Sequence, residues 1–204
     1  TIARNIEAEN PKLHTLLLTA VEQKPDSETH ELNYLQDRVI REALAEDRFA
    51  LFAQPILPLA SEQTEPRFEF LLRMIAADGE LLPPEKFLSA ADRYQLLPAI
   101  DRWVVKNALA ALATHKEALK GRGMRFSVNI SGASIASDEF LEFMEKSIRE
   151  SGVPPHALCF ELTETSAVSN LGRADRLMQR LRLLGCNFAL DDFGTGLSSL
   201  VYLK

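Results

Sequence analysis

The fold class is decided by residues 158–192, which read LCFELTETSAVSNLGRADRLMQRLRLLGCNFALDD. Residues 158–162 form a short apolar run that predicts a strand, and residues 188–191 form a second one. Between them, residues 172–184 have the length of a helix, and Gly185 closes it. A strand, a helix and a second strand in this order indicate a parallel pair with a crossover helix, so the chain is predicted to be an α/β protein.

The same alternation extends toward the N-terminus. Strands are predicted at 49–59, 68–75 and 125–130, and helices at 35–47, 84–91, 99–119 and 138–151. Five short strands, all but the first two separated by helices, favour a sheet with parallel pairing. The pattern alone does not separate an open doubly wound sheet from a closed barrel. Residues 1–34 are read as a linker or the tail of an upstream domain, and residues 35–204 as the domain itself.

Composition narrows the class of protein. The chain has 204 residues and a net charge of −6, whereas general nucleic-acid binding needs a basic surface, so a DNA or RNA duplex is not expected as a partner. No apolar run reaches the roughly 18 residues of a membrane span. Cys159 and Cys186 have no metal-ligand spacing and are read as small core residues in a reducing compartment. The predicted location is the cytoplasm, either as a free protein or as the cytoplasmic part of a membrane-anchored one.

Polar side chains stand where the apolar strands end. They are Glu69 in the second strand, Asn129 at the end of the third, Glu161 at the end of the fourth, and Asp191 with Asp192 at the end of the fifth. The carboxyl ends of parallel strands share one edge of a sheet, so these groups are expected to converge there. Oxygen-only ligands favour Mg²⁺ or Mn²⁺, and such an ion removes the repulsion between neighbouring carboxylates. Two ions about 4 Å apart could clamp a phosphodiester and activate water.

A structural role is the alternative interpretation of these acids. A single acid at a strand end is more often the N-cap of the next helix than a ligand. Glutamate is a poor N-cap, however, and Glu69 stands in the apolar run FEFLL, where a carboxylate needs a partner. The loop DFGTGLSS at 192–199 could bring its backbone close to a phosphate, although an ordinary strand-to-helix turn would explain it as well.

Five sequence blocks, in the right order, are similar to those of the EAL domain family. The blocks are QPI at 54–56, EFLLR at 69–73, VNIS at 128–131, ELTE at 161–164 and DDFGTG at 191–196. They correspond to the family's QPI, EALxR, VNxS, ELTE and DDFGTG motifs. Because five ordered blocks leave little room for a chance match, residues from about 37 to 204 are identified as resembling this family.

The resemblance implies a modified (β/α)₈ barrel of the TIM type, whose first strand runs antiparallel to the others and of which this chain holds about the first five strands. It implies a metal-dependent phosphodiesterase that hydrolyses cyclic di-GMP to linear pGpG, with two Mg²⁺ or Mn²⁺ ions activating water. Cyclic di-GMP is the implied partner. A homodimer is compatible with the resemblance, and residues 1–34 suggest an upstream sensory or cyclase domain.

Carried over position by position, the resemblance also assigns a metal site. Glu69, Asn129, Glu161 and Asp191 are implied to hold the first metal ion. Asp191 and Asp192 are implied to reach the second. In a regular strand these two adjacent side chains would diverge, but a bend at the strand end would let each carboxylate serve one ion.

Further roles follow from the same resemblance. The implied catalytic set consists of Glu69, Asp191, Asp192 and Glu164. Within it, Glu164 is implied to hold the loop from 192 to 199 in its working shape. Gln54 and Arg73 are implied to contact the nucleotide, with Arg73 at a phosphate.

Three features depart from the family pattern. Phe70 replaces the alanine of the name motif, and because successive strand residues face opposite sides, it is predicted to point toward a packing helix while Glu69 faces the site. Leu197 stands where the family has an aromatic residue. The chain ends at Lys204, before the lysine, glutamates and glutamine of the family's later strands, so residues 1–204 alone are predicted to be inactive. A catalytically inactive cyclic di-GMP receptor or a regulatory interaction module therefore stays open as the alternative.

Overall fold

The chain folds into two compact units. Among the described residues, the first combines 26–52 with 72–100, and the second combines 53–58 and 65–71 with 101–192. The computed structural model describes residues 26–58 and 65–192. The predictions for residues 1–25, for the glycine-bearing loop beyond Asp192 and for the end of the chain at Lys204 therefore lie outside the described residues.

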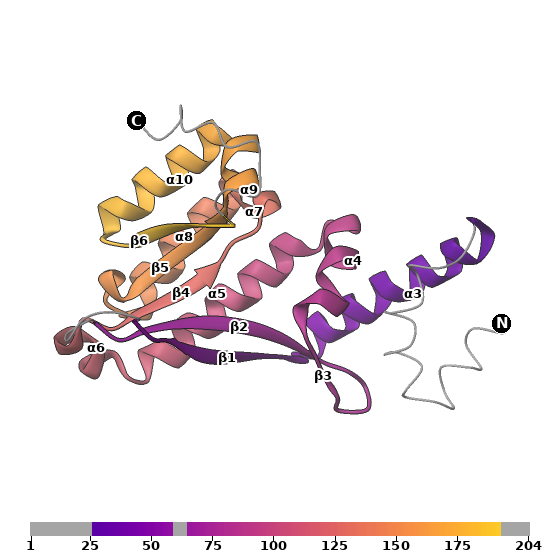
Figure 1. Cartoon of the computed structure of the whole chain (residues 1–204), viewed down its shortest axis with the longest axis horizontal. Coiled ribbons are helices and arrows are strands. Elements are labelled where there is room, and N and C mark those ends of the chain that lie inside the picture. The colour runs from indigo at the N-terminus through magenta and orange to yellow at the C-terminus, as the bar shows by residue number, and fades with distance from the viewer. Residues whose placement is uncertain (1–25, 59–64, 193–204) are drawn as a thin grey trace. The chain divides into compact units, whose positions relative to one another are not determined.

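One sheet runs through the chain in the order β1–β2–β4–β5–β6, and β3 pairs with β2 off this path (Figure 1). The strands are β1 (Phe49–Ile56), β2 (Arg67–Ile75), β3 (Leu81–Leu82), β4 (Arg125–Asn129), β5 (Leu158–Thr163) and β6 (Asn187–Asp191). Strand β1 is antiparallel to β2, whereas β2, β4, β5 and β6 are parallel to one another. The predictions of an α/β fold and of an antiparallel first strand are confirmed. Strand β3 was not predicted, because two residues are too short to show alternation.

Helix α3 (Asp26–Ala45) provides much of the core of the first unit. Its residues Val39 and Ala43 are buried, four positions apart, so that one face of the helix is apolar. Helix α4 (Leu88–Arg93) contacts α3 and follows the 3₁₀ turn η2 (Pro84–Lys86). The helix predicted at 84–91 is therefore a turn and a short helix.

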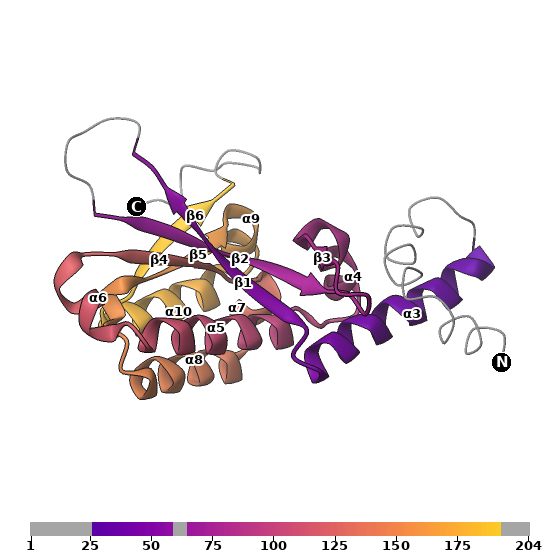
Figure 2. The same ribbon diagram turned by 90° about the horizontal axis from the view of Figure 1, so that it is seen from below.

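Three long helices cover one face of the sheet in the second unit, which also contains shorter helices and a 3₁₀ turn (Figure 2). These elements are α5 (Leu97–Ala113, in this unit from residue 101), α6 (Lys116–Arg122), α7 (Gly132–Ile135), α8 (Asp138–Ser151), the 3₁₀ turn η3 (Pro155–Ala157), α9 (Glu164–Ser169) and α10 (Leu171–Leu184). Figure 2 shows α5, α8 and α10 on the same side of β4, β5 and β6. Within the described part of the chain, no helix combines the length and apolar character that a membrane span requires.

Burial along β5 shows how the sheet separates core from site. Leu158, Phe160 and Leu162 are buried, whereas the residues between them, such as Glu161, are only half-buried. Because side chains alternate between faces along a strand, one face of β5 packs in the core and the other carries polar groups. The site described below lies on this second face.

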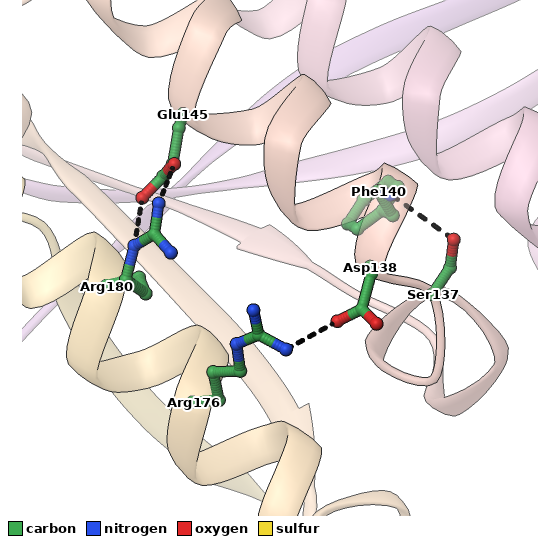
Figure 3. Close-up of polar contacts among 6 residues, drawn as sticks. All are labelled: Ser137, Asp138, Phe140, Glu145, Arg176 and Arg180. Atoms are coloured by element: carbon green, nitrogen blue, oxygen red, sulfur yellow. Dashed lines mark hydrogen bonds and ion pairs between the residues drawn. The ribbon is translucent and has the colours of Figure 1, made fainter.

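Helix α8 begins and ends as local sequence signals predict, at Asp138 and Ser151. The Ser137 hydroxyl accepts a hydrogen bond from the Phe140 backbone N–H at 3.2 Å, which is an N-cap (Figure 3). At the other end Gly152 adopts a left-handed φ of 68°, which glycine tolerates better than any other residue. The prediction at 138–151 is therefore confirmed residue for residue.

Two other helix predictions were wrong at their boundaries. The helix predicted at 35–47 is the second half of the longer α3, which begins at Asp26 and ends at Ala45. The helix predicted at 99–119 is interrupted between α5 and α6 at Thr114 and His115. The Thr114 hydroxyl donates to the Ala111 carbonyl at 2.7 Å, and this local bond competes with the continuation of the helix.

The short helices α7 and α9 were not predicted, although they lie directly after two strands of the site. The hydroxyl of Ser131 accepts the Ser134 N–H at 3.2 Å to cap α7. The hydroxyl of Thr163 accepts the Ser166 N–H at 3.2 Å to cap α9. With four and six residues, these helices are too short for a hydrophobic period to reveal them.

Candidate functional site

Strand register places the polar residues of the predicted site on one face of the sheet. Asn129 of β4 is directly opposite Glu161 of β5, and Asp191 of β6 is opposite Thr163 of β5. Glu69 of β2 is opposite Ser127, two residues before Asn129. Since residues two apart along a strand share a face, all of these groups stand on the face of Glu161.

Asn129 and Glu69 are in direct contact across neighbouring strands. The carboxamide nitrogen of Asn129 donates to Oε1 of Glu69 at 2.8 Å, although 60 positions separate the two residues in the sequence. An asparagine that donates through nitrogen still has its carboxamide oxygen to offer to a cation. Two of the predicted metal ligands are therefore held together by the fold.

The carboxylate of Glu161 lies in the field of two others. Its pKa is raised, first by partial burial and further by the negative charges of Glu69 and Asp191, while a hydrogen bond with Ser127 acts in the opposite direction. Three strands thus bring acids close enough to disfavour one another's ionised form. A bound cation would reverse this effect and favour the carboxylate of Glu161.

The end of β6 departs from regular strand geometry. Asp192 has a φ of 54°, in the left-handed region, and its backbone N–H donates to Oδ1 of Asp191 at 2.9 Å. This turn interrupts the strict alternation of side chains. Asp191 and Asp192, both exposed, are therefore not forced to opposite faces as they would be in a continuous strand.

The donor set fits a hard divalent cation by its chemistry. Glu69, Asn129, Glu161 and Asp191 offer only oxygen atoms, and oxygen ligands suit Mg²⁺ or Mn²⁺ better than Zn²⁺. Over the ranges 26–58 and 65–192, no group of three or more histidine, cysteine, aspartate or glutamate side chains is arranged to hold a metal ion. The contacts that the structure supplies are pairwise, so convergence of the four ligands on one point stays a prediction.

The remaining predicted residues lie in different surroundings. Gln54 is exposed on β1 in the second unit. Arg73 belongs to the first unit, where its guanidinium lies 6.0 Å from the ring centroid of Phe52 and donates to the Leu72 carbonyl at 2.7 Å. Glu164 is the first residue of α9 and is buried, 9% exposed. Its predicted role toward the loop beyond Asp192 concerns residues outside the described range.

Phe70 points away from the site. Its ring is buried and lies 5.5 Å from that of Phe126, and both line an apolar groove of about 500 Å³ with Leu112 and Leu119 of the covering helices. Glu69, the preceding residue, contacts Asn129 on the opposite face. The predicted orientation of Phe70 is confirmed, and the E-F-L variant is a change in the core rather than in the donor set.

The capping alternative does not account for Asn129 and Glu161. The first turns of α7 and α9 are capped by Ser131 and Thr163, as described above. Asn129 instead contacts Glu69, and Glu161 has a hydrogen bond with Ser127. These polar side chains are therefore available for a role at the site.

Sequence reasoning missed two polar residues that support the site. Ser127, which bonds Glu161, is 7% exposed, and its place two residues before Asn129 was the signal that could have identified it. Asp101, in α5, accepts hydrogen bonds from Ser131 and Ser134. No local sequence signal indicates this contact, because about thirty residues separate the partners.

The two cysteines line the same polar pocket as Glu161. Burial raises the pKa of the Cys186 thiol to about 12, and the charge of Cys159 adds to the effect. Burial and the charge of Glu161 raise the pKa of Cys159 as well. Because only the thiolate reacts, both thiols are expected to be unreactive in the folded protein.

We predict slow modification of Cys186 by a disulfide reagent at pH 8. With a pKa of about 12, only about one Cys186 in ten thousand is ionised at that pH. Labelling followed by mass spectrometry of the Cys186 peptide should be at least about a hundredfold slower in the folded protein than in urea. Equal rates in both conditions would contradict the burial of this thiol.

The fold and the site define a class of protein before any comparison is made. In barrels of alternating strands and helices, functional groups gather at the carboxyl ends of the parallel strands, which is where the acidic groups of this chain lie. The EAL domain model matches residues 37–204 of the chain. The chain belongs to the EAL domain family.

The relatives include named cyclic di-GMP phosphodiesterases. Cyclic di-GMP phosphodiesterase PdeB of Shewanella oneidensis is 36% identical over 165 residues, which cover 81% of this chain and 19% of the relative. Cyclic di-GMP phosphodiesterase PdeF of Escherichia coli is 33% identical over 175 residues, which cover 83% of this chain and 23% of the relative. The chain thus spans about a fifth of the length of the curated relatives that it matches.

Solved structures of EAL domains share the fold. The FimX EAL domain of Pseudomonas aeruginosa bound to cyclic di-GMP has a TM-score of 0.71 and 31% identity, covering 79% of this chain and 64% of that one. A complex of the PaMucR phosphodiesterase with cyclic di-GMP has a TM-score of 0.73 and 26% identity, and the match covers 82% of this chain and 67% of that one. These matches confirm the predicted barrel-type α/β architecture.

Proposed function

We propose that this chain forms part of a metal-dependent phosphodiesterase that hydrolyses cyclic di-GMP to linear pGpG. One observation carries the proposal. The acids of three family motifs stand on one face of the sheet, with Asn129 in contact with Glu69 and with Glu161 in the field of Glu69 and Asp191. Membership of a family that contains cyclic di-GMP phosphodiesterases supports the substrate.

Each residue of the set has a proposed task. Glu69, Asn129, Glu161 and Asp191 would hold one metal ion, and Asp191 with Asp192 would reach a second. Bound Mg²⁺ or Mn²⁺ would supply the Lewis acidity and the activated water that phosphodiester hydrolysis needs. The contact between Asn129 and Glu69 fixes the orientation of both donor groups before any ligand arrives, which reduces the reorganisation that binding requires.

The nucleotide would be held by the other motif residues. Arg73 carries a permanent positive charge that suits a phosphate, and Gln54 is exposed and able to hydrogen bond. Glu164 would keep the loop that follows Asp192 in its working shape. Phe70 takes no part in this scheme, because it packs on the opposite face of the sheet.

A receptor that binds cyclic di-GMP without cleaving it is the second candidate. It is supported by the solved FimX EAL domain, which is bound to cyclic di-GMP. A regulatory interaction module that uses the fold without the nucleotide is the third. All three share the family and the fold, so only the chemistry of the full-length protein separates them.

The deciding experiment incubates the full-length protein with cyclic di-GMP and Mg²⁺ or Mn²⁺ and separates the products by chromatography. We expect pGpG to accumulate with metal and not with a chelator. Calorimetric titration of cyclic di-GMP is run in parallel. Binding without product would favour the receptor, and neither binding nor product would refute the proposal in favour of an interaction module.

A further inference from the structure

Asp101 of α5 is a buried carboxylate that has no task in the proposed reaction. The residue is only 7% exposed. One of its carboxylate oxygens, Oδ2, accepts three hydrogen bonds. The donors are the Ser131 backbone N–H at 2.9 Å, the Ser131 hydroxyl at 2.6 Å and the Ser134 hydroxyl at 2.6 Å. Burial raises the pKa of Asp101, and these hydrogen bonds act against that change. These hydrogen bonds restrain the Asp101 carboxylate and also restrain Ser131 and Ser134.

These hydrogen bonds fix the segment that follows Asn129. Ser131 comes two residues after Asn129, and the residue between them, Ile130, is buried. The Ile130 backbone N–H donates to the Glu161 carbonyl at 3.0 Å. Residues 129–131 are therefore secured on one side by the backbone of β5 and on the other by Asp101.

Helix α7, which Asp101 anchors, also lies against the next helix along the rim. A Cβ atom placed on Gly132 would come within 2.9 Å of the Ser166 hydroxyl of α9. A side chain at this position would displace the Ser166 side chain, so α7 and α9 approach each other closely here. The helices that follow β4 and β5, α7 and α9, are therefore packed against each other. Asp101 holds α7 through its hydrogen bonds with Ser131 and Ser134.

We propose that Asp101 is a positioning residue for the candidate metal site, holding Ser131 and Ser134 so that Asn129 stays against Glu69. This inference rests on the proposed function, because Asn129 and Glu69 are metal ligands only if that proposal holds. Asp101 contacts neither Asn129 nor Glu69 and acts through Ser131. Groups that orient metal ligands are worth about 10- to 100-fold in metal affinity.

The first test is calorimetric titration of Mn²⁺ into the full-length protein. Asp101→Ala removes the acceptor of three donors and should weaken Mn²⁺ binding by about tenfold. Asp101→Asn keeps an acceptor oxygen and should stay within about threefold of wild type. The matched control is Arg180→Met, which destabilises the α8–α10 contact without touching residues 129–134, and should leave Mn²⁺ affinity unchanged.

The second test needs no metal. NMR spectra of the protein with labelled asparagine side chains report the Asn129 carboxamide, and hydrogen exchange reports the Ser131 N–H. Asp101→Ala should shift the Asn129 signal and speed exchange at Ser131 by about tenfold or more, whereas Arg180→Met should do neither. If Asp101→Ala fails to fold, Ser134→Ala is measured in its place, because it removes one of the three donors and keeps the Ser131 cap of α7.

The outcomes separate the two proposals. Wild-type protein that binds no Mn²⁺ would refute the metal-dependent function, while the NMR measurement would still decide whether Asp101 positions Asn129. An unchanged Asn129 signal in Asp101→Ala would overturn the inference. So would an equal loss of Mn²⁺ affinity in Arg180→Met, because that result would trace the effect to stability alone.

Discussion

Replacing Glu69 with glutamine is expected to lower the turnover of cyclic di-GMP by the full-length protein about a thousandfold, equivalent to about 4 kcal/mol. Glutamine can still accept the hydrogen bond from Asn129, so the local geometry is kept. What the variant lacks is the negative charge that a divalent cation needs from its ligand. The measurement is the rate of pGpG formation at fixed Mg²⁺, followed by chromatography.

Glu142→Gln serves as the matched control, since Glu142 is exposed on α8 and the variant makes the same chemical change. Turnover by this control should equal that of wild type. Calorimetry with Mn²⁺ should show weaker binding only for Glu69→Gln. If Glu69→Gln retains activity within a few-fold of wild type, Glu69 is not a metal ligand and the proposed site is wrong for this residue.

The fold class could be predicted because its signals are local. Strand β5 has a buried apolar residue at every second position, and α8 is bounded by Ser137 and Gly152, so each element is determined by residues within it or next to it. The choice between an open sheet and a barrel was left to the family resemblance. That choice depends on how distant strands pair, which no periodicity within a strand reports.

Helix boundaries failed where local competition decides them. The interruption at Thr114 coincides with a hydroxyl that bonds a carbonyl three residues earlier, and the apolar pattern does not reveal this local bond. Helices α7 and α9 are marked by their N-caps, Ser131 and Thr163, more than by any hydrophobic period. Short helices of this kind are found by reading capping residues at strand ends.

The sequence could predict that polar residues at the strand ends share one face of the sheet, but it could not predict the residues that support them. Asn129 and Glu161 follow from the rule that parallel strands present their carboxyl ends at one edge, and the strand register places them opposite each other. Asp101 obeys no such rule. It lies in a helix and meets Ser131 only because the fold brings α5 to the segment that follows β4, so this contact depends on tertiary structure alone.

Replacing Arg180 with methionine is expected to destabilise the fold by about 2 kcal/mol. Arg180 of α10 forms a two-point ion pair with Glu145 of α8, at 2.8 Å from Nε to Oε1 and 2.6 Å from Nη2 to Oε2 (Figure 3). Glu145 is only 6% exposed, so its carboxylate would be left buried without this partner. Breaking a fully buried pair costs more, about 3–5 kcal/mol, but Arg180 is nearly half exposed and water can replace part of the contact.

The neighbouring pair on the same two helices provides the control. Arg176 and Asp138 meet at 3.0 Å, yet both side chains are largely exposed, so Arg176→Met should cost about 0.5 kcal/mol or less (Figure 3). The free energy of unfolding of both variants is measured in the full-length protein by urea titration, with hydrogen exchange of the backbone amides of α8 and α10 as the signal. The double variant Arg180→Met with Glu145→Met should recover much of the lost stability, because two apolar side chains need no ion partner. Equal effects of Arg180→Met and Arg176→Met would show that burial of Glu145 does not determine the strength of its ion pair.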